Sequence, residues 1–434
     1  MSSSPNSPNL SVSRKAVVAS SFGNALEWYD FTVYAFFATY IAATFFQDGD
    51  DTQAMISTFL AFGVGFVARP VGSLVLGVFA DRRGRKPALM LSLFTMALGV
   101  LVIAVTPSAA TIGLAAPVLL LFGRLLQGFS AGGELGSAAS YLVEHAPADR
   151  RSGYAAWLQA SMGISNLLSA IAGLLVTSFF TESEILEWAW RLPFFAGLLL
   201  IPVGLYIRRQ LPETAEFEAE AGTRSIGEMF GVLFREHWQA LVAGFGFCVL
   251  WNGAVASVIV FGPTYYRISG GLGFSSQQTF LASFVGNIFF VVTCLVSGRL
   301  ADRLGRRTVL TIAAVALAVV PVVMLWLVHS VSTVPVVLVV HSALCVCVAL
   351  FVGVAPSTLP MAFAPEVRSS GVSITYNLAA ICFAGFVPAW LTWADRAVSV
   401  FSPALLMAGC AVLTLACIPW LFREIHAVEM HSAN

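Results

Sequence analysis

Two carboxylates occur in the stretch GNALEWYDF, residues 23–31, inside a run that is otherwise apolar. They belong to Glu27 and Asp30, and a carboxylate held away from water can bind and release a proton or pair with a guanidinium. At helical spacing Asn24, Glu27, Asp30 and Tyr34 fall on one face. The stretch therefore predicts a helix whose polar stripe faces a protein interior.

Three further ionisable side chains lie deep in apolar segments, namely Arg69, Arg124 and Glu134. Arg124, Gln127 and Glu134 share a second helix face. A charge at the centre of a bilayer costs on the order of 2.5–3.5 kcal/mol, so such charges persist where they work or where they pair with one another. The sequence thus offers candidates for proton transfer and anion binding, with buried structural ion pairs as the alternative.

The composition explains where these charges must sit. Charged residues make up 11% of the 434-residue chain, hydrophobic residues 58%, and the mean hydropathy is +0.84. Soluble domains contain about a quarter charged residues, so this chain is a membrane protein. Apolar runs long enough to span a bilayer as helices recur along it. They predict an all-α membrane protein with twelve transmembrane helices, over 17–46, 54–80, 88–106, 112–142, 153–180, 188–207, 238–262, 277–301, 308–328, 334–362, 370–394 and 403–422.

Most basic residues fall on one side of these helices, and the other side has only Arg191, Arg267 and Arg396. The positive-inside rule then makes both termini cytoplasmic, and the polar N-terminus is expected to be a tail and not a signal peptide. The net charge of zero gives no basic patch for nucleic acid. The basic residues of the crowded side are Arg14, Lys15, Arg82, Arg83, Arg85, Lys86, Arg150, Arg151, Arg208, Arg209, Arg224, Arg235, Arg299, Arg303, Arg306, Arg307, Arg368 and Arg423.

The chain contains an internal repeat. GVFADRRGRKPAL at 77–89 returns as GRLADRLGRRTVL at 298–310, and LVEHAPADRRSG at 142–153 returns as PMAFAPEVRSSG at 360–371. Two pseudo-symmetric six-helix halves are therefore expected. The predicted parts are a cytoplasmic tail, an N-terminal half, a cytoplasmic linker with an amphipathic helix, a C-terminal half and a second cytoplasmic tail, over 1–16, 17–207, 208–237, 238–422 and 423–434.

The repeated loops resemble the G-x-x-x-D-R-x-G-R-[KR] loop of the major facilitator superfamily. GNALEWYDF, GRLLQGFSAGGELGSAASYLVEHAP and RRQLPETAEF together resemble its metabolite:proton symporter family, and FFATYIAATFF looks most like the citrate and tricarballylate carriers. The resemblance implies the major facilitator fold in a bacterial inner membrane. It also implies proton-coupled uptake of citrate, 2-oxoglutarate, shikimate, proline or betaine. The fifth predicted helix lacks the Gly-Pro-rich motif of drug antiporters, which disfavours export.

Residue roles follow from the same resemblance. Proton-coupled sugar porters of the superfamily have a helix-one Asp after a Tyr, opposite a helix-four Arg that precedes a loop Pro. Asp30 and Arg124 match that pattern, with Glu27 as the fallback proton carrier and Glu134 as a further candidate for coupling. The repeated loops imply a cytoplasmic gate whose candidate residues are Asp81, Arg85, Glu144, Asp302 and Arg306.

Substrate contacts are expected from arginines first, because a guanidinium fork suits a carboxylate. Arg69 and Arg124 are the candidate anchors. Other polar or aromatic side chains that interrupt the helices are weaker candidates, since each alone is more often an interhelical hydrogen bond. They are Asn24, Tyr34, Gln127, Gln159, Asn166, Trp251, Asn252, Asn287, His341, Tyr376 and Asn377. No deep carboxylate is recognised in the second half, which assigns proton coupling to the first.

No nucleophile and base pair, metal-ligand spacing or phosphate-binding loop stands out, so we expect no enzyme activity, no metal and no cofactor beyond the proton gradient. The seven cysteines are interpreted as core residues. The expected function is proton symport of a small organic acid, most suitably a di- or tricarboxylate such as citrate. The expected partners are that acid, the proton and the lipid bilayer, without nucleic acid or an obligate protein partner. The alternatives are symport of zwitterionic osmolytes, in which Glu27 meets a quaternary ammonium beside Trp251 or Tyr34, and a membrane sensor that does not transport.

Overall fold

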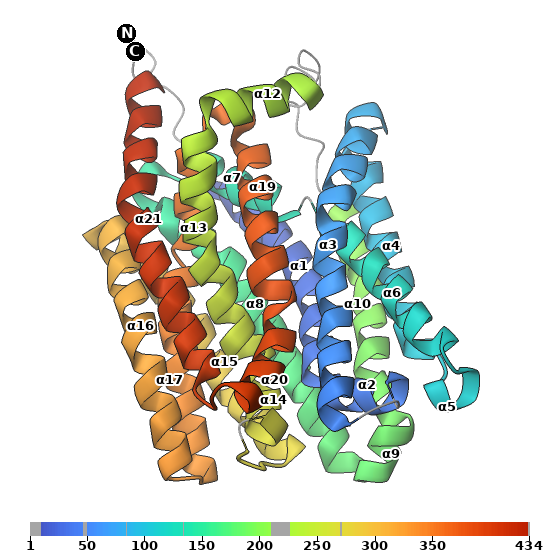
Figure 1. Cartoon of the computed structure of the whole chain (residues 1–434). Helices are drawn as coiled ribbons and strands as arrows, with labels where there is room; N and C mark the ends of the chain where they lie inside the picture. The colour runs from blue at the N-terminus through green and yellow to red at the C-terminus, as the bar shows by residue number, and fades with distance from the viewer. Residues whose placement is uncertain are drawn as a thin grey trace.

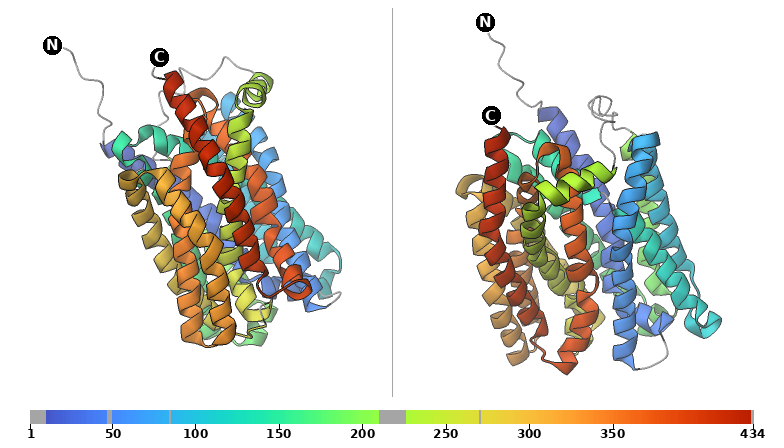
Figure 2. Two further views of the ribbon diagram at one scale, coloured as in Figure 1. Left: turned by 60° about the vertical axis from the view of Figure 1, so that its left-hand side comes forward. Right: turned by 45° about the horizontal axis from the view of Figure 1, so that its top comes forward.

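The computed structural model describes residues 10–46, 50–83, 85–132, 134–209, 226–269 and 271–432. These residues form a bundle of long, roughly parallel helices, and no strand occurs among them. The beginning of α1 and the end of α21 lie at the same end of the bundle (Figure 1, Figure 2). We call this the termini end, and the opposite one the far end.

The described residues of the first half form ten α-helices and two short 3₁₀ turns. They are α1 (Leu10–Phe36), α2 (Ala38–Phe45), α3 (Asp51–Arg83), α4 (Arg85–Val105), α5 (Ala109–Ile112), α6 (Ala115–Ala131), α7 (Glu134–His145), η1 (Ala148–Arg150), α8 (Arg151–Phe179), α9 (Glu182–Glu187), η2 (Ala189–Arg191) and α10 (Leu192–Arg209).

The second half follows α12 (Ile226–Glu236), which lies in the predicted linker. Three of its turns, η3, η4 and η7, are π-helical and interrupt or follow the long helices. Its elements are α13 (Trp238–Val255), η3 (Ala256–Val260), α14 (Gly262–Thr264), η4 (Tyr265–Ser269), α15 (Ser276–Leu304), α16 (Arg306–Ser330), α17 (Val334–Val352), α18 (Ala355–Thr358), η5 (Leu359–Ala362), η6 (Pro365–Val367), α19 (Arg368–Ala380), η7 (Ile381–Gly385), α20 (Val387–Ala397) and α21 (Ser402–Ser432).

Among the described residues, nine helical stretches are long and apolar enough to cross a membrane. The other three predicted spans coincide with α1 and α2, with α4 and with α10, all of which are helical. The all-α membrane architecture is confirmed, and the count of twelve stays a prediction. The last helix runs to Ser432, through the segment that the sequence assigns to a tail.

Glycines let α6 and α7 approach their neighbours closely, as the four-residue glycine spacing in this segment favours. A Cβ at Gly128 would overlap the Gly65 carbonyl of α3, and one at Gly132 would overlap the Arg69 carbonyl. The close contact of α3 and α6 places Arg69 near Arg124. Gly305 has φ of 89° in the loop between α15 and α16, a conformation that favours glycine.

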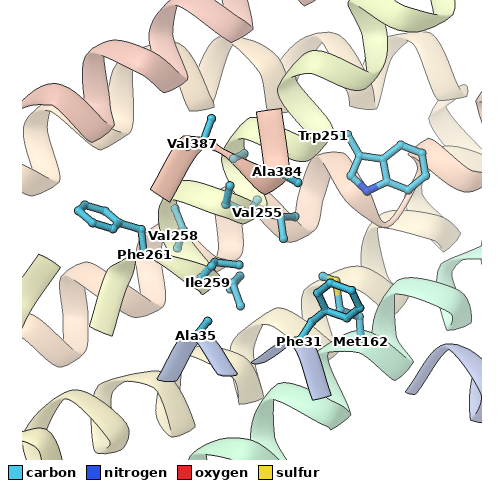
Figure 3. Close-up of a cluster of buried hydrophobic side chains, with 14 of the residues drawn as sticks. Phe31, Ala35, Met162, Trp251, Val255, Val258, Ile259, Phe261, Ala384 and Val387 are labelled. Carbon is cyan, nitrogen blue, oxygen red and sulfur yellow. The ribbon is translucent and has the colours of Figure 1, made fainter. Parts of the chain in front are cut away.

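The two halves meet along two main seams. α8 packs along α15, and α3 packs against η7 and α20. Buried side chains from helices of both halves form an apolar layer (Figure 3). It includes Phe31, Ala35, Met162, Trp251, Val255, Val258, Ile259, Phe261, Ala384 and Val387, all of them buried.

Most cysteines are buried in this core, but the expectation that all seven are core residues is wrong for Cys382, which is exposed in η7. The sequence places it in an apolar span, and η7 turns its side chain outward.

Candidate functional site

Glu27 on α1 and Arg69 on α3 form a buried ion pair in the first half. Arg69 Nη2 donates to Glu27 Oε1 at 2.7 Å. The side chain of Arg69 is 3% exposed and that of Glu27 is 7% exposed. The guanidinium carbon lies 4.8 and 4.4 Å from the ring centroids of Phe31 and Phe66. Arg69, a candidate substrate anchor, therefore holds a carboxylate of the protein in this conformation. Its buried Nε has no hydrogen-bond partner.

Arg124 on α6 is completely buried. Its Nη1 donates to Gln127 Oε1 at 2.6 Å, and its Nη2 donates to the Phe62 carbonyl at 3.3 Å. Its guanidinium carbon lies 4.7 Å from the ring centroid of Phe31, 4.5 Å from that of Tyr34 and 4.9 Å from that of Phe62. Its Nε has no hydrogen-bond partner. The aromatic rings exclude water from the guanidinium and leave one donor unused.

Asp30 lies one turn beyond Glu27 and is 4% exposed. Its Oδ2 is buried without a hydrogen-bond partner, and a Cβ at Gly197 of α10 would lie 3.1 Å from its Oδ1. Arg124 and Glu27 are the charged groups that act on it. Asp30 and Arg124 are both described, and the structure records no ion pair between them, because Arg124 is turned to Gln127 and the Phe62 carbonyl.

Two other members of the α1 stripe attach α1 to neighbouring helices. Asn24 Nδ2 donates to the Leu158 carbonyl at 2.7 Å and to Ser161 Oγ at 3.0 Å. The Tyr34 hydroxyl donates to the Thr58 carbonyl at 2.9 Å. Both are candidate substrate contacts by sequence, and in this conformation their polar atoms serve helix packing.

A chain of hydrogen bonds crosses from the first half to the second. Thr32 Oγ1 donates to Asn166 Oδ1 at 2.7 Å, and Asn166 Nδ2 donates to Asn287 Oδ1 at 3.0 Å. Asn287 Nδ2 then donates to the Ser283 carbonyl of its own helix at 2.8 Å. Asn166 and Asn287, predicted independently as lining residues, thus meet each other at the seam between α8 and α15.

The second half contributes an aromatic pair to the centre of the bundle. The rings of Trp251 and Tyr376 lie 5.0 Å apart, edge to face. Asn252 Nδ2 donates to the Cys248 carbonyl of its own helix at 3.0 Å. In the first half, Gln159 Oε1 and Gln127 Nε2 are buried without hydrogen-bond partners. These amides keep polar atoms that a ligand can use.

His341 on α17 is buried beside α15. Its Nδ1 and the Tyr266 hydroxyl are 3.4 Å apart, and its Nε2 has no hydrogen-bond partner. A Cβ at Gly286 would collide with the imidazole ring. The histidine therefore lies next to the helix that carries Asn287.

At the termini end, we define a termini-end latch from three of the contacts that join the halves. Arg368 Nη1 donates to Glu144 Oε1 at 2.8 Å. Asp302 accepts from the backbone N–H groups of Ser152 and Gly153 at 2.9 and 2.8 Å, at the N-terminus of α8. The third contact runs from Asn377 Nδ2 to the Gly132 carbonyl at 2.9 Å.

One predicted gate residue, Arg306, lies outside this latch. Arg306 Nη1 donates to the Ser357 carbonyl at 2.8 Å, within the second half. Asn377, a candidate substrate contact, takes part in the latch instead. The side chains of Asp81, Arg85 and Glu134 lie outside the described residues.

A second set of contacts closes the far end, and we call it the far-end latch. Arg267 of η4 donates to Glu182 Oε1 of α9 at 2.7 Å and to Thr39 Oγ1 at 2.6 Å. The Tyr40 hydroxyl and Ser276 Oγ are 2.8 Å apart. Contacts at both ends of the bundle thus join the two halves.

Sequence reasoning did not find the far-end latch. The sequence places Arg267 on the side with few basic residues and Glu182 between the predicted spans 153–180 and 188–207, and no motif or spacing connects the two. Asp395 was missed as well, because the predicted span ended at 394, whereas the structure buries this carboxylate to 4% exposure. The second half therefore contains a carboxylate buried in the protein near the end of α20, and the expectation of no carboxylate deep in the membrane there stays a prediction.

No group of three or more His, Cys, Asp or Glu side chains arranged to hold a metal ion occurs in the described part of the chain.

Comparison with known proteins gives consistent matches. The sequence model of the Major Facilitator Superfamily matches residues 20–387. The chain is 35% identical to a citrate-proton symporter of Klebsiella pneumoniae, over 96% of this chain and 94% of that protein. It is 32% identical to a proline/betaine transporter of Escherichia coli K12, over 93% and 82% of the two chains.

Among solved structures, the fold is similar to that of a proton:xylose symporter bound to 6-bromo-6-deoxy-D-glucose, with a TM-score of 0.75 at 15% identity. The match covers 94% of this chain and 95% of that one. The xylose transporter from E. coli in a partially occluded inward-open conformation matches with a TM-score of 0.74, at 15% identity, over 93% and 98% of the two chains.

Proposed function

This chain belongs to the major facilitator superfamily, and on that premise we propose that it is a secondary active transporter that takes up a small organic acid together with protons. The proposed substrates are di- and tricarboxylates such as citrate. The similarity to a citrate-proton symporter over nearly the whole of both chains supports this choice. The two halves rock around a midplane site to expose it alternately on the two sides.

The observation that carries the proposal is the group of two guanidiniums and two carboxylates buried together between α1, α3 and α6. Arg69 is neutralised by Glu27. Arg124 has neutral partners among its hydrogen bonds and keeps one donor unused. A guanidinium in a water-excluded, aromatic-lined position attracts a carboxylate and binds it with directed hydrogen bonds.

Asp30 supplies the proton coupling in this proposal. When it is protonated, Arg124 is available to an anionic substrate. After substrate and proton leave, the carboxylate of Asp30 attracts Arg124, and the empty carrier can return. Asp30 without an ion-pair partner and Arg124 turned away correspond to the substrate-receptive arrangement of this cycle. Glu27, one turn away, is the fallback proton carrier.

In this proposal, the two latches open in turn, so that the binding site is exposed first at one end of the bundle and then at the other. Opening the far end requires the Arg267–Glu182 pair to break, and opening the termini end requires the Glu144–Arg368 pair to break. We place the termini end in the cytoplasm of a bacterial cell and the protein in its inner membrane, following the distribution of basic residues. The proposal includes no enzyme activity, no cofactor beyond the proton gradient, no nucleic acid and no obligate protein partner.

Symport of a zwitterionic osmolyte is the second candidate, and one observation favours it. The edge-to-face pair of Trp251 and Tyr376 offers an aromatic surface to a quaternary ammonium, while Arg124 takes the carboxylate. The similarity to a proline/betaine transporter supports this alternative.

Uptake into proteoliposomes tests the function. With an acidic outside, labelled citrate is expected to accumulate above equilibrium and to stop accumulating when a protonophore is added. Unlabelled di- and tricarboxylates should compete, and betaine and proline should not. Competition by betaine alone would select the osmolyte carrier, and ligand-induced thermal stabilisation without any uptake would select a sensor.

The ion pair between Glu27 and Arg69 yields a separate prediction. Glu27→Gln leaves a buried guanidinium without its counter-charge, which costs about 3–5 kcal/mol. The double variant Glu27→Gln with Arg69→Gln removes both charges and is expected to regain thermal stability. It should still show at least about a tenfold increase in KM, because a binding group for the substrate carboxylate is gone. The measurements are the thermal unfolding midpoint in detergent and concentration-dependent uptake.

Asp149→Asn with Arg150→Gln serves as the control, because it removes an exposed ion pair in the turn before α8, outside the buried cluster and both latches. If the double variant at Glu27 and Arg69 kept the wild-type KM, Arg69 would be excluded from substrate binding and left with a structural role.

A further inference from the structure

Gln127 lies one turn after Arg124 on α6 and is 1% exposed. Its Oε1 accepts from Arg124 Nη1 at 2.6 Å, a short hydrogen bond from a charged donor. This contact fixes the orientation of the amide, because turning its NH₂ group to the guanidinium would place a donor against a donor. Nε2 is therefore the end of the amide that is left for another acceptor, and it has no hydrogen-bond partner in the described part of the chain.

Packing against α4 holds the Gln127 side chain in this position. A Cβ at Gly99 of α4 would lie 2.9 Å from Gln127 Cγ and 2.7 Å from the Gly123 carbonyl oxygen, closer than packed atoms come. The α4 backbone thus lies directly against the methylene groups of Gln127. A side chain that is already held by packing loses little conformational entropy when it binds a ligand.

The two arginines of the buried cluster differ in the group that holds them. Arg69 donates to a carboxylate, Glu27 Oε1, at 2.7 Å, whereas Arg124 donates to an amide oxygen at 2.6 Å. The first pair is neutral overall, but the second keeps the full positive charge of the guanidinium. The choice of glutamine at position 127 therefore concentrates the attraction for an anion at Arg124.

The chemistry of the unused donors narrows the group that fits there. Arg124 Nε and Gln127 Nε2 are both buried donors without partners among the described residues, and they belong to side chains in direct contact. A buried donor without an acceptor is costly. An ionised carboxylate offers only acceptors, whereas a carboxamide or a protonated acid also brings a donor. The pair is thus complementary to a carboxylate.

We propose that Gln127 is a specificity-determining residue of the substrate site. Its oxygen holds Arg124 without neutralising it, and its Nε2 donates to the carboxylate that Arg124 binds. The inference rests on the proposed function, which supplies the carboxylate substrate and makes Arg124 its anchor. Arg124 and Gln127 then act as one unit that selects a group with a negative charge and no donor.

Gln127→Glu tests this role, because it exchanges one NH₂ group for an oxygen and keeps the shape of the side chain. The new carboxylate gives the buried guanidinium a counter-charge, so the thermal unfolding midpoint of the empty protein is expected to rise. The same carboxylate neutralises Arg124 and can no longer donate, so the Kd for citrate is expected to rise about 100-fold or more. Thermal unfolding without ligand and isothermal titration with citrate measure the two effects on the full chain. A purely structural role would change the unfolding midpoint and leave the Kd unchanged.

Gln127→Met provides a second variant of similar volume that neither accepts nor donates. Arg124 keeps its charge but loses the group that holds it, so the Kd for citrate is expected to rise about tenfold and the unfolding midpoint to fall. This variant keeps the binding measurement possible if Gln127→Glu cannot be purified. Gln53→Glu, the same replacement at an exposed glutamine in the first turn of α3, is the control and should keep the wild-type values.

A wild-type Kd for citrate in Gln127→Glu, or a lower unfolding midpoint of that variant, would overturn the proposal. Either result together with citrate uptake by the wild-type protein rejects this inference alone. Weakened citrate binding in Gln127→Glu without any uptake by the wild type rejects transport alone. If the wild type binds betaine and not citrate, the carboxylate of betaine should show the same loss of affinity in Gln127→Glu. A wild type that binds neither compound rejects the carboxylate substrate, and this inference with it.

Discussion

Replacing Asp30 with Asn is expected to abolish proton-driven accumulation of substrate while substrate binding and downhill counterflow remain. Asparagine has nearly the shape of the protonated acid and cannot release a proton. The side chain is buried, and its Oδ2 has no hydrogen-bond partner, so an amide fits without breaking an existing ion pair. Under a pH gradient, the substrate concentration inside the vesicles should reach only that outside. The variant would thus lose all ability to concentrate substrate.

The assay compares uptake under an imposed pH gradient with exchange of labelled for unlabelled substrate at equal pH. Asp149→Asn, at an exposed carboxylate in the turn before α8, is the matched control and should behave like wild type. If the Asp30→Asn protein still concentrates substrate with only a proton gradient supplied, Asp30 does not couple. Glu27 would then be the next residue to test.

Replacing Arg124 with Lys is expected to raise the Kd for the substrate about 100-fold, which corresponds to ~3 kcal/mol. Lysine keeps the positive charge but lacks the planar guanidinium that lies against Phe31 and Phe62 and donates to Gln127. The lysine side chain is shorter and ends in a single ammonium group. It cannot keep these contacts and also hold a carboxylate with two parallel hydrogen bonds.

Isothermal titration of the purified protein with citrate measures this effect. Arg396→Lys, at the far end and outside the buried cluster, is the control, and a thermal unfolding curve shows whether each variant folds. An Arg124→Lys protein that is folded and binds citrate with wild-type affinity would remove Arg124 from the binding site. Arg69 would then be the remaining candidate anchor.

Much of the architecture follows from sequence periodicity and composition. In lipid no water can bond the backbone, and a helix satisfies its backbone hydrogen bonds within its own segment. Long apolar runs therefore predict helices directly. The repeated loops predict two halves, and the match to the superfamily confirms the fold. The glycine spacing in α6 predicts a close helix contact, and the structure places the Gly65 carbonyl of α3 against Gly128. These features depend on patterns within short stretches of the sequence, so one sequence is enough to predict them.

The pairing of the charges was decided by tertiary structure. Periodicity puts Glu27 and Asp30 on one face of α1, but it cannot give the axial offset of α3 and α6 relative to α1. Packing sets that offset, and it joins Glu27 to Arg69 while leaving Asp30 without a partner.

The same reason explains the contacts that sequence analysis missed. Arg267 meets Glu182 only because helices from distant parts of the chain end at the same level of the bundle. Residue types, their spacing and their burial in lipid were thus readable from the sequence. Which acid meets which base depends on how far each helix slides and rotates against its neighbours, and only the packed bundle determines this.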